Sequence, residues 1–165
     1  MSTQQQRPFP LVRATDREDE RRQTYAHPLN PRSEIVGLSL SELVGLERIG
    51  VHLVRVPPGK EAFIYHSHAT EEEFLYVLSG RGIAEIGDEE HEVGQGDFMG
   101  FPTPSVGHHL RNPFDEELVY LMGGERRSTE IADFPRIRKR IIRVGSEAHL
   151  VDHAHLHPFW RGEEE

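Results

Sequence analysis

From residue 48 onward the sequence breaks into short apolar and β-branched runs that alternate with glycine and proline turns. Each run has the length of one strand, and no helical period is sustained across this block. Strand-sized runs at this spacing are typical of an all-β sandwich or barrel. The expected strands span residues 50–56, 62–66, 73–78, 82–86, 90–93, 98–101, 108–112 and 118–122.

The joints between these runs carry turn chemistry. Pro57, Pro58 and Gly59 cannot continue a strand ladder, because proline lacks the backbone donor. Gly87 and Asp88 form a plausible two-residue hairpin loop, since glycine adopts positive φ at little cost. A hairpin is therefore predicted between the fourth and fifth expected strands.

A chain of 165 residues suits one domain. Residues 1–33 are polar and interrupted by prolines, so we expect an irregular N-terminal arm. Residues 34–144 hold the expected barrel, with a short basic edge strand at Ile137–Val144. Residues 145–165 are expected to form a C-terminal tail that ends in three glutamates.

Composition excludes several classes of site. The chain has no cysteine, which removes disulfides, thiolate nucleophiles and cysteine-based metal sites. Nineteen Lys and Arg against 28 Asp and Glu give a net charge of -9, which disfavours nucleic-acid binding. No apolar run approaches the roughly 20 residues of a membrane span, and no signal peptide is evident. We therefore expect a cytoplasmic protein with no nucleic-acid or membrane partner.

One group of residues has the pattern of a metal site. His66 and His68 are two apart on an expected strand, so both imidazoles face the same way. Glu73 opens the next strand and His108 lies on a later one, and a closed barrel brings such strands together around its mouth. Three imidazoles and a carboxylate suit one divalent Fe, Mn, Ni, Zn or Cu ion. These four residues are the predicted metal ligands.

The same residues carry a resemblance to a known family. Gly59, His66, His68, Glu73 and Gly80 are spaced as in the first motif of the cupin superfamily, with one extra residue before the first histidine. The second motif is resembled more loosely. It is formed by Gly96, Pro102, His108 and Asn112, with Pro104 where the pattern prefers glycine and one extra residue before the histidine.

The resemblance covers about residues 50–122. It implies an all-β fold, a double-stranded β-helix or jelly-roll barrel. It also implies a metal held by the motif histidines and glutamate, and often a homodimer.

Alternative ligands remain open at two positions. His109 adjoins His108, and strand alternation lets only one of them face inward. The spacing to Asn112 favours His108. Glu71 and Glu72 precede Glu73 but do not fit the motif spacing, so they are interpreted as solvated turn residues. His27, His52 and His91 are interpreted as surface or packing residues.

No catalytic residue can be assigned from the sequence. Ala62, Ile64, Leu75 and Val77 are expected to line the barrel interior, in phase with His66 or Glu73. Tyr120 is interpreted as a half-buried barrel residue, and the alternative is a hydrogen-bond donor or acid there. Metal-dependent oxidation of a small organic molecule is the leading hypothesis, because open positions on such a metal can hold substrate and dioxygen. Sugar-phosphate isomerisation is the first alternative, and non-catalytic binding of a small molecule is the second.

Overall fold

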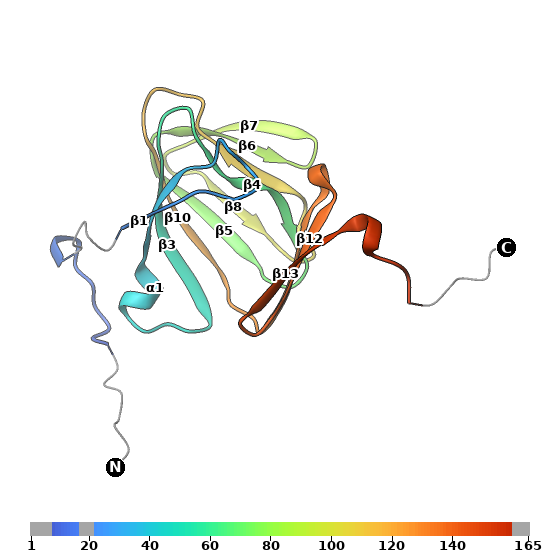
Figure 1. The fold of residues 1–165 in the computed structure, drawn as a ribbon. Coiled ribbons are helices and arrows are strands. Elements are labelled where there is room, and N and C mark those ends of the chain that lie inside the picture. The colour runs from blue at the N-terminus through green and yellow to red at the C-terminus, as the bar shows by residue number, and fades with distance from the viewer. Residues whose placement is uncertain (1–7, 17–21, 160–165) are drawn as a thin grey trace, which may run out of the picture.

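The strands of the protein form two antiparallel sheets that face each other, as the computed structural model shows (Figure 1). The structure describes residues 8–16 and 22–159. Helix is almost absent: α1 covers Leu40–Leu43, and short 3-10 turns occur at Ala14–Asp16, Pro135–Ile137 and His153–His155. The expected all-β, jelly-roll fold is confirmed.

The first sheet has six strands. In spatial order they are β1 (Gln23–Tyr25), β2 (Ile35–Ser39), β3 (Ile49–Val56), β10 (Leu118–Glu125), β5 (Glu73–Ser79) and β8 (Phe98–Phe101).

The second sheet has seven strands. Their order is β13 (Glu147–Asp152), β12 (Lys139–Val144), β11 (Thr129–Phe134), β4 (Glu61–His68), β9 (His108–Arg111), β6 (Arg81–Ile86) and β7 (Glu89–Gly94).

The main hydrophobic core lies between the two sheets. Alternate residues of each strand face inward, so Val54 and Val56 of β3 meet Leu118 and Tyr120 of β10 on the same side. The opposite sheet adds Ala62 and several others to the same cluster. Burying each large apolar side chain contributes roughly 1.5–3 kcal/mol. This core fixes which residues of every strand face the barrel interior.

The predicted hairpin is present. β6 and β7 pair from Arg81 opposite Gly94 to Ile86 opposite Glu89, which leaves Gly87 and Asp88 as the loop. Gly87 has a φ of 60°, in the left-handed region that glycine adopts most easily. The glycine at this position therefore sets the register of the hairpin.

The sequence analysis missed strands outside the central block. Within the expected arm, β1 pairs with β2, and within the expected tail, β13 pairs with β12 along its whole length. The parts of the expected arm and tail at residues 1–7, 17–21 and 160–165 lie outside the described residues. No helix in the described part of the chain is long and apolar enough to cross a membrane.

Candidate metal centre

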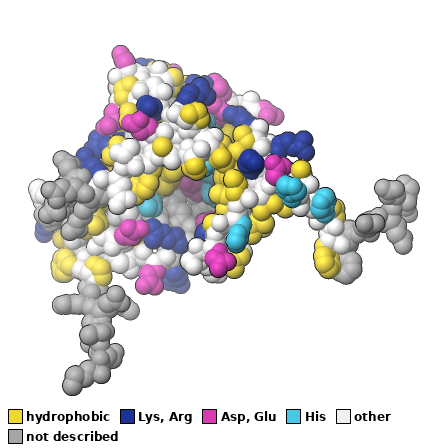
Figure 2. All heavy atoms as spheres, viewed as in Figure 1, with side chains coloured by type: hydrophobic (Ala, Val, Ile, Leu, Met, Phe, Trp, Pro, Cys, Tyr) yellow, Lys and Arg dark blue, Asp and Glu magenta, His cyan; other side chains and the backbone are white. Residues whose placement is uncertain are grey.

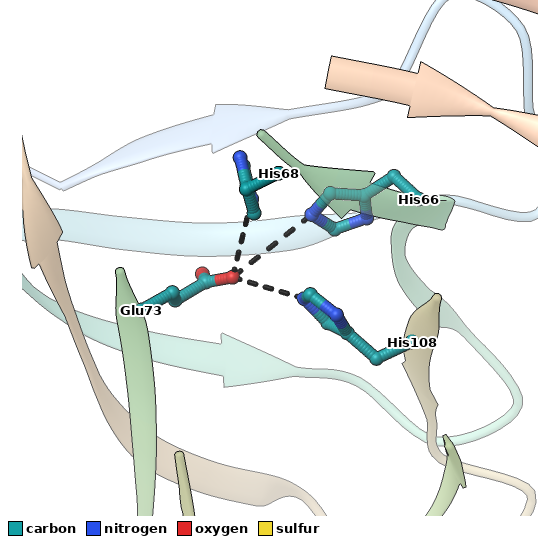
Figure 3. Close-up of side chains that lie close together, drawn as sticks. All are labelled: His66, His68, Glu73 and His108. Carbon is teal, nitrogen blue, oxygen red and sulfur yellow. Dashed lines mark hydrogen bonds and ion pairs between the residues drawn. The ribbon is translucent and has the colours of Figure 1, made fainter. Parts of the chain in front are cut away.

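The structure brings the four predicted ligands together at one end of the barrel (Figure 3). One donor atom from each of them lies within 4.8 Å of the others. Oε2 of Glu73 is 3.0 Å from Nε2 of His108, 3.4 Å from Nε2 of His68 and 4.0 Å from Nε2 of His66. The three distances to Glu73, from 3.0 to 4.0 Å, are separations that ligands about 2 Å from one shared ion have.

Strand pairing explains the convergence. His66 on β4 lies directly opposite His108 on β9, so the two imidazoles are cross-strand neighbours. His68 is two residues further along β4 and shares their face. Glu73 comes from β5 in the other sheet, where it lies opposite Phe101. The Phe101 ring stacks on His108 at 3.7 Å between centroids, which holds that imidazole across the gap between the sheets.

Hydrogen bonds to the protein leave Nε2 of two histidines free. Nδ1 of His66 is 2.6 Å from the backbone oxygen of Ile64, and Nδ1 of His108 is 3.0 Å from that of Val106. A carbonyl can only accept, so Nδ1 carries the proton in each ring. The lone pair of Nε2 then points at the Glu73 carboxylate. This is the usual arrangement of histidines that bind a metal through Nε2.

The histidine nitrogens and the Glu73 oxygen that face one another require a cation between them. Nitrogen lone pairs and a carboxylate oxygen are all acceptors, and acceptors in contact repel unless a proton or a metal ion lies between them. The donor set of three imidazoles and one carboxylate matches what Fe, Mn, Ni, Zn and Cu prefer. The residues present therefore fit a divalent metal ion.

The electrostatics of His66 and Glu73 favour the protonation states that a metal needs. Burial alone would lower the pKa of His68, but Glu73 and Glu130 outweigh it and raise that pKa. Burial, followed by the proximity of His108, lowers the pKa of His66 to about 3, so its imidazole is neutral near pH 7. Burial alone would raise the pKa of Glu73. The adjoining imidazoles of His108 and His68 outweigh that effect and lower its pKa, so the carboxylate is ionised.

His68 is oriented by a carboxylate rather than by a carbonyl. Its Nδ1 lies 3.4 Å from Oε1 of Glu130 on β11, and Glu130 is almost fully buried. The same carboxylate accepts bonds from the backbone N–H groups of Ala69 and Thr70 and from the Thr70 hydroxyl. Glu130 thus ties the turn between His68 and Glu73 to the neighbouring strand. Sequence analysis missed this residue, because no motif or spacing marks it.

The alternative ligand residues, His109, Glu71 and Glu72, lie outside the cluster. His109 lies between Glu61 and Glu85, with 3.7 Å from Nε2 to the first carboxylate and 3.7 Å from Nδ1 to the second. Glu71 forms an ion pair with Arg143, and Glu72 is exposed. None of these three is among the side chains that converge in the cluster.

The barrel interior behind the cluster is nearly filled. A cavity of about 30 Å³ remains there, lined mainly by apolar side chains together with His66, Glu73 and His108. Phe63 lines it rather than the expected Ile64. The reason is an irregularity in β4 between Ala62 and His66, where Phe63 adopts a φ of 57°. A cavity of this size holds about one water molecule.

Tyr120 also lines this cavity, and it is fully buried. Burial, with a smaller effect of the Glu73 charge, raises the pKa of its hydroxyl. The phenol therefore stays protonated, and it can act at most as a hydrogen-bond donor toward the cluster.

A larger hollow of about 160 Å³ opens outward from the cluster. His68, Glu73 and Met122 line its inner part, and His52 and Arg126 lie in its outer part. Figure 2 shows a hollow in this face of the molecule, with histidine, basic and acidic side chains around it. His52 was interpreted as a surface or packing residue, and the structure instead places it beside the candidate metal centre. No signal in the sequence separates it from the other histidines.

Comparison with known proteins gives consistent matches. A family model described as "Cupin domain" matches residues 52–124. A stretch of 57 residues is 39% identical to "Uncharacterized protein MJ1618" of Methanocaldococcus jannaschii. That match spans 34% of this chain and 44% of the relative, so the chain covers less than half the length of this curated protein.

Two solved structures resemble most of the chain. The first is a "Putative sugar phosphate isomerase" from Acidithiobacillus ferrooxidans, 37% identical, with a TM-score of 0.87 over 92% of this chain and 97% of that one. The second is a "sugar phosphate isomerase from a cupin superfamily" from Silicibacter pomeroyi, 27% identical, with a TM-score of 0.74 over 81% and 87% of the two chains.

Proposed function

The chain belongs to the cupin superfamily, and on that premise we propose that it is a metal-dependent enzyme that isomerises a small phosphorylated sugar. The proposed ligands are His66, His68, Glu73 and His108. The observation that carries the proposal is the convergence of these side chains beside an open, polar hollow. The names of the two similar structures support the substrate class.

The shape of the site favours a polar substrate. The apolar interior cavity, about 30 Å³ in volume, is too small for a ring or a sugar. We expect the substrate to approach from the outward hollow, whose lining includes His52, Arg126 and several carboxylates. The polar lining of this hollow supports sugar-phosphate isomerisation over the oxidation of a phenol or diketone.

The residues of the chain have separate tasks in this proposal. The four ligands hold the ion, and the ion would supply Lewis-acid polarisation of a carbonyl or hydroxyl oxygen of the sugar. Tyr120 remains protonated and closes the inner side of the site. Glu130 orients His68. The filled barrel behind Tyr120 keeps bulk water from the inner side of the ligands.

Metal-dependent oxidation remains the second candidate. Three histidines and one carboxylate leave about two positions of an octahedral ion open, which is enough for a substrate and dioxygen. The two reactions differ in their need for oxygen.

The test is an activity screen. Protein reconstituted with iron, manganese, nickel or zinc is incubated with pentose and hexose phosphates, with and without air, and aldose–ketose conversion is followed. We expect anaerobic conversion that disappears in the His66→Ala, His68→Ala double variant. Strictly oxygen-dependent turnover of phenols or diketones would favour the second candidate. Absence of turnover with every metal would leave a binding protein and reject the proposal.

A further inference from the structure

The inward-facing row of side chains between β3 and β10 ends in a pair of glycines. Val56 pairs with Leu118, Val54 with Tyr120 and His52 with Met122, and these pairs follow one another toward the mouth of the barrel. The next inward pair is Gly50 opposite Gly124. At that level neither strand places a side chain in the interior, so the mouth stays open directly above His52.

The Arg126 side chain occupies part of the space left by the absence of a side chain at Gly50. A Cβ atom at Gly50 would lie 3.1 Å from Nε of Arg126 and 3.4 Å from Nε2 of His52. The first contact is tighter than an ordinary van der Waals contact and the second lies at its lower limit, so a side chain at Gly50 would push against the guanidinium of Arg126. Glycine at this position gives the guanidinium and the imidazole room to lie side by side in the mouth.

The charge of Arg126 is only loosely compensated. Its Nη2 lies 3.4 Å from the Ser41 hydroxyl and 3.4 Å from a carboxylate oxygen of Glu42. The Glu42 side chain is 68% exposed. Exposed ion pairs of this kind contribute little free energy, because water screens them and the side chains lose entropy. A stronger anion in the hollow can therefore replace Glu42.

Two of the other carboxylates around the hollow have cationic partners of their own. Glu71 pairs with Arg143, and Glu125 lies 3.6 Å from Arg127. Arg126 is the one Lys or Arg among the described residues that line this hollow. His52 adds a second donor, because burial and then the Arg126 charge lower its pKa and leave a neutral imidazole whose N–H can donate.

We propose that Arg126 and His52 form an anion-binding subsite beside the metal centre, which takes the phosphate group of the substrate. The inference rests on the proposed function, since it assigns the part of the site that recognises the substrate. In this arrangement the phosphate lies in the outer hollow against the guanidinium. The sugar then extends inward toward His68 and Glu73, which line the same hollow.

The test measures binding rather than turnover. Metal-loaded protein is titrated calorimetrically with inorganic phosphate, with a hexose phosphate and with the same hexose lacking phosphate. We expect Arg126→Gln to weaken binding of both phosphate probes at least about tenfold, the scale of one charge-assisted bidentate contact. Affinity for the neutral hexose and for the metal should not change. Arg81→Gln, a matched change at an arginine of β6 that does not line the hollow and pairs with Glu92 and Glu116, is the control and should bind as the wild type does.

Two further variants test the geometry. His52→Gln should weaken phosphate binding about threefold, because it replaces one neutral donor by another in a different position. Gly50→Ala should also weaken it, because the added methyl group displaces the Arg126 side chain. Metal-free wild type should still bind inorganic phosphate, which separates this subsite from binding to the ion itself.

Several results would overturn the subsite: no phosphate binding by the wild type, phosphate binding that requires the metal, or unchanged binding by Arg126→Gln. The proposed function is judged separately. Phosphate binding through Arg126 without isomerisation would reject the function and keep the subsite. Isomerisation with unchanged kinetics in Arg126→Gln would keep the proposed function and reject the subsite.

Discussion

Glu130 orients the imidazole of His68, just as backbone carbonyls orient the imidazoles of His66 and His108. Each of the three imidazoles has an acceptor next to Nδ1, and this leaves Nε2 for the centre. The acceptor of His68 is a buried carboxylate on a different strand, and it also binds the turn that leads to Glu73. The position of two proposed ligands therefore depends on one side chain outside both motifs.

Replacing Glu130 by glutamine should weaken metal binding about 10–100-fold, the usual effect of removing a partner that orients a ligand. The amide would place a donor against the Nδ1 proton of His68 or force the ring into its other tautomer. Competition with a chelator measures the affinity, and the absorption spectrum of the cobalt form reports the altered ligand field. Thr70→Val removes one hydrogen bond to Glu130 but keeps the carboxylate, so its metal affinity should fall much less. Equal losses in the two variants would show that Glu130 acts only by holding the turn.

The neighbouring histidines of β9 should respond differently to mutation. His108→Ala removes a side chain 3.0 Å from Glu73 and should reduce metal affinity by at least about 100-fold. His109→Ala should leave metal affinity nearly unchanged, because His109 contacts Glu61 and Glu85 instead. Elemental analysis and titration with the same metal measure the metal affinity of the two variants. A larger loss in the His109 variant would mean that the wrong histidine has been proposed as the ligand.

Sequence spacing located the residues of the cluster, because strand alternation and a short turn place His66, His68 and Glu73 on one face. It could not locate Glu130, His52 or Arg126. Their positions depend on which strands are neighbours, and each lies far along the chain from the residues that it approaches. A residue of ordinary type at an ordinary spacing carries no local signal of such a contact.

At the level of elements, β8 was predicted residue for residue, and most central strands within one to three residues at each end. The strands that were missed are β1, β2, β11 and β13. Of these, β11 and β13 mix charged and apolar residues without a clean alternation, and β13 faces solvent over most of its length. Pairing with a neighbouring strand, rather than local sequence preference, stabilises strands of this kind.

The outer face of the seven-stranded sheet carries a charged network that depends on pH. Burial would raise the pKa of Glu85, but Arg136, His109 and Arg111 outweigh it and lower the pKa. A carboxylate with a lowered pKa stabilises the fold above its unfolded pKa and stops doing so as pH falls through the folded value. Glu85→Gln should therefore reduce the free energy of unfolding by about 1–3 kcal/mol at pH 7.

That difference should shrink toward zero as the pH falls below about 4, the range in which glutamate titrates. Urea unfolding of metal-free wild type and Glu85→Gln at a series of pH values measures this difference in the free energy of unfolding. Metal-free protein is used because acid would also release the ion. A difference that stays constant from pH 7 to pH 3 would contradict a role for the ionised carboxylate.

At the level of the whole molecule, the outer face of the six-stranded sheet presents an apolar strip. Leu53, Leu121, Tyr76 and Phe98 are successive cross-strand neighbours on β3, β10, β5 and β8. Exposure increases along the strip, and Phe98, on the edge strand β8, is 65% exposed. An unpaired edge with exposed aromatic side chains is typical of a surface that another chain covers.

We therefore expect a homodimer that buries this strip. Light scattering at micromolar concentration should give twice the mass of one chain, and Tyr76→Glu or Phe98→Glu should shift it toward the monomer. Leu150→Glu, a matched change at an exposed leucine of β13 in the other sheet, should leave the dimer intact. A monomeric wild type would reject the expectation.

The two sheets meet at the candidate metal centre, since the three imidazoles belong to the seven-stranded sheet and the carboxylate to the six-stranded one. An ion held by all four residues binds only when both sheets are in place. By mass action it adds to the free energy of folding, about 2.7 kcal/mol when free metal is a hundredfold above its dissociation constant. With the proposed ion bound, the melting temperature of this protein would depend on the activity of the metal as well as on the sequence. Two variants can be compared for stability only in solutions that buffer the ion at the same level.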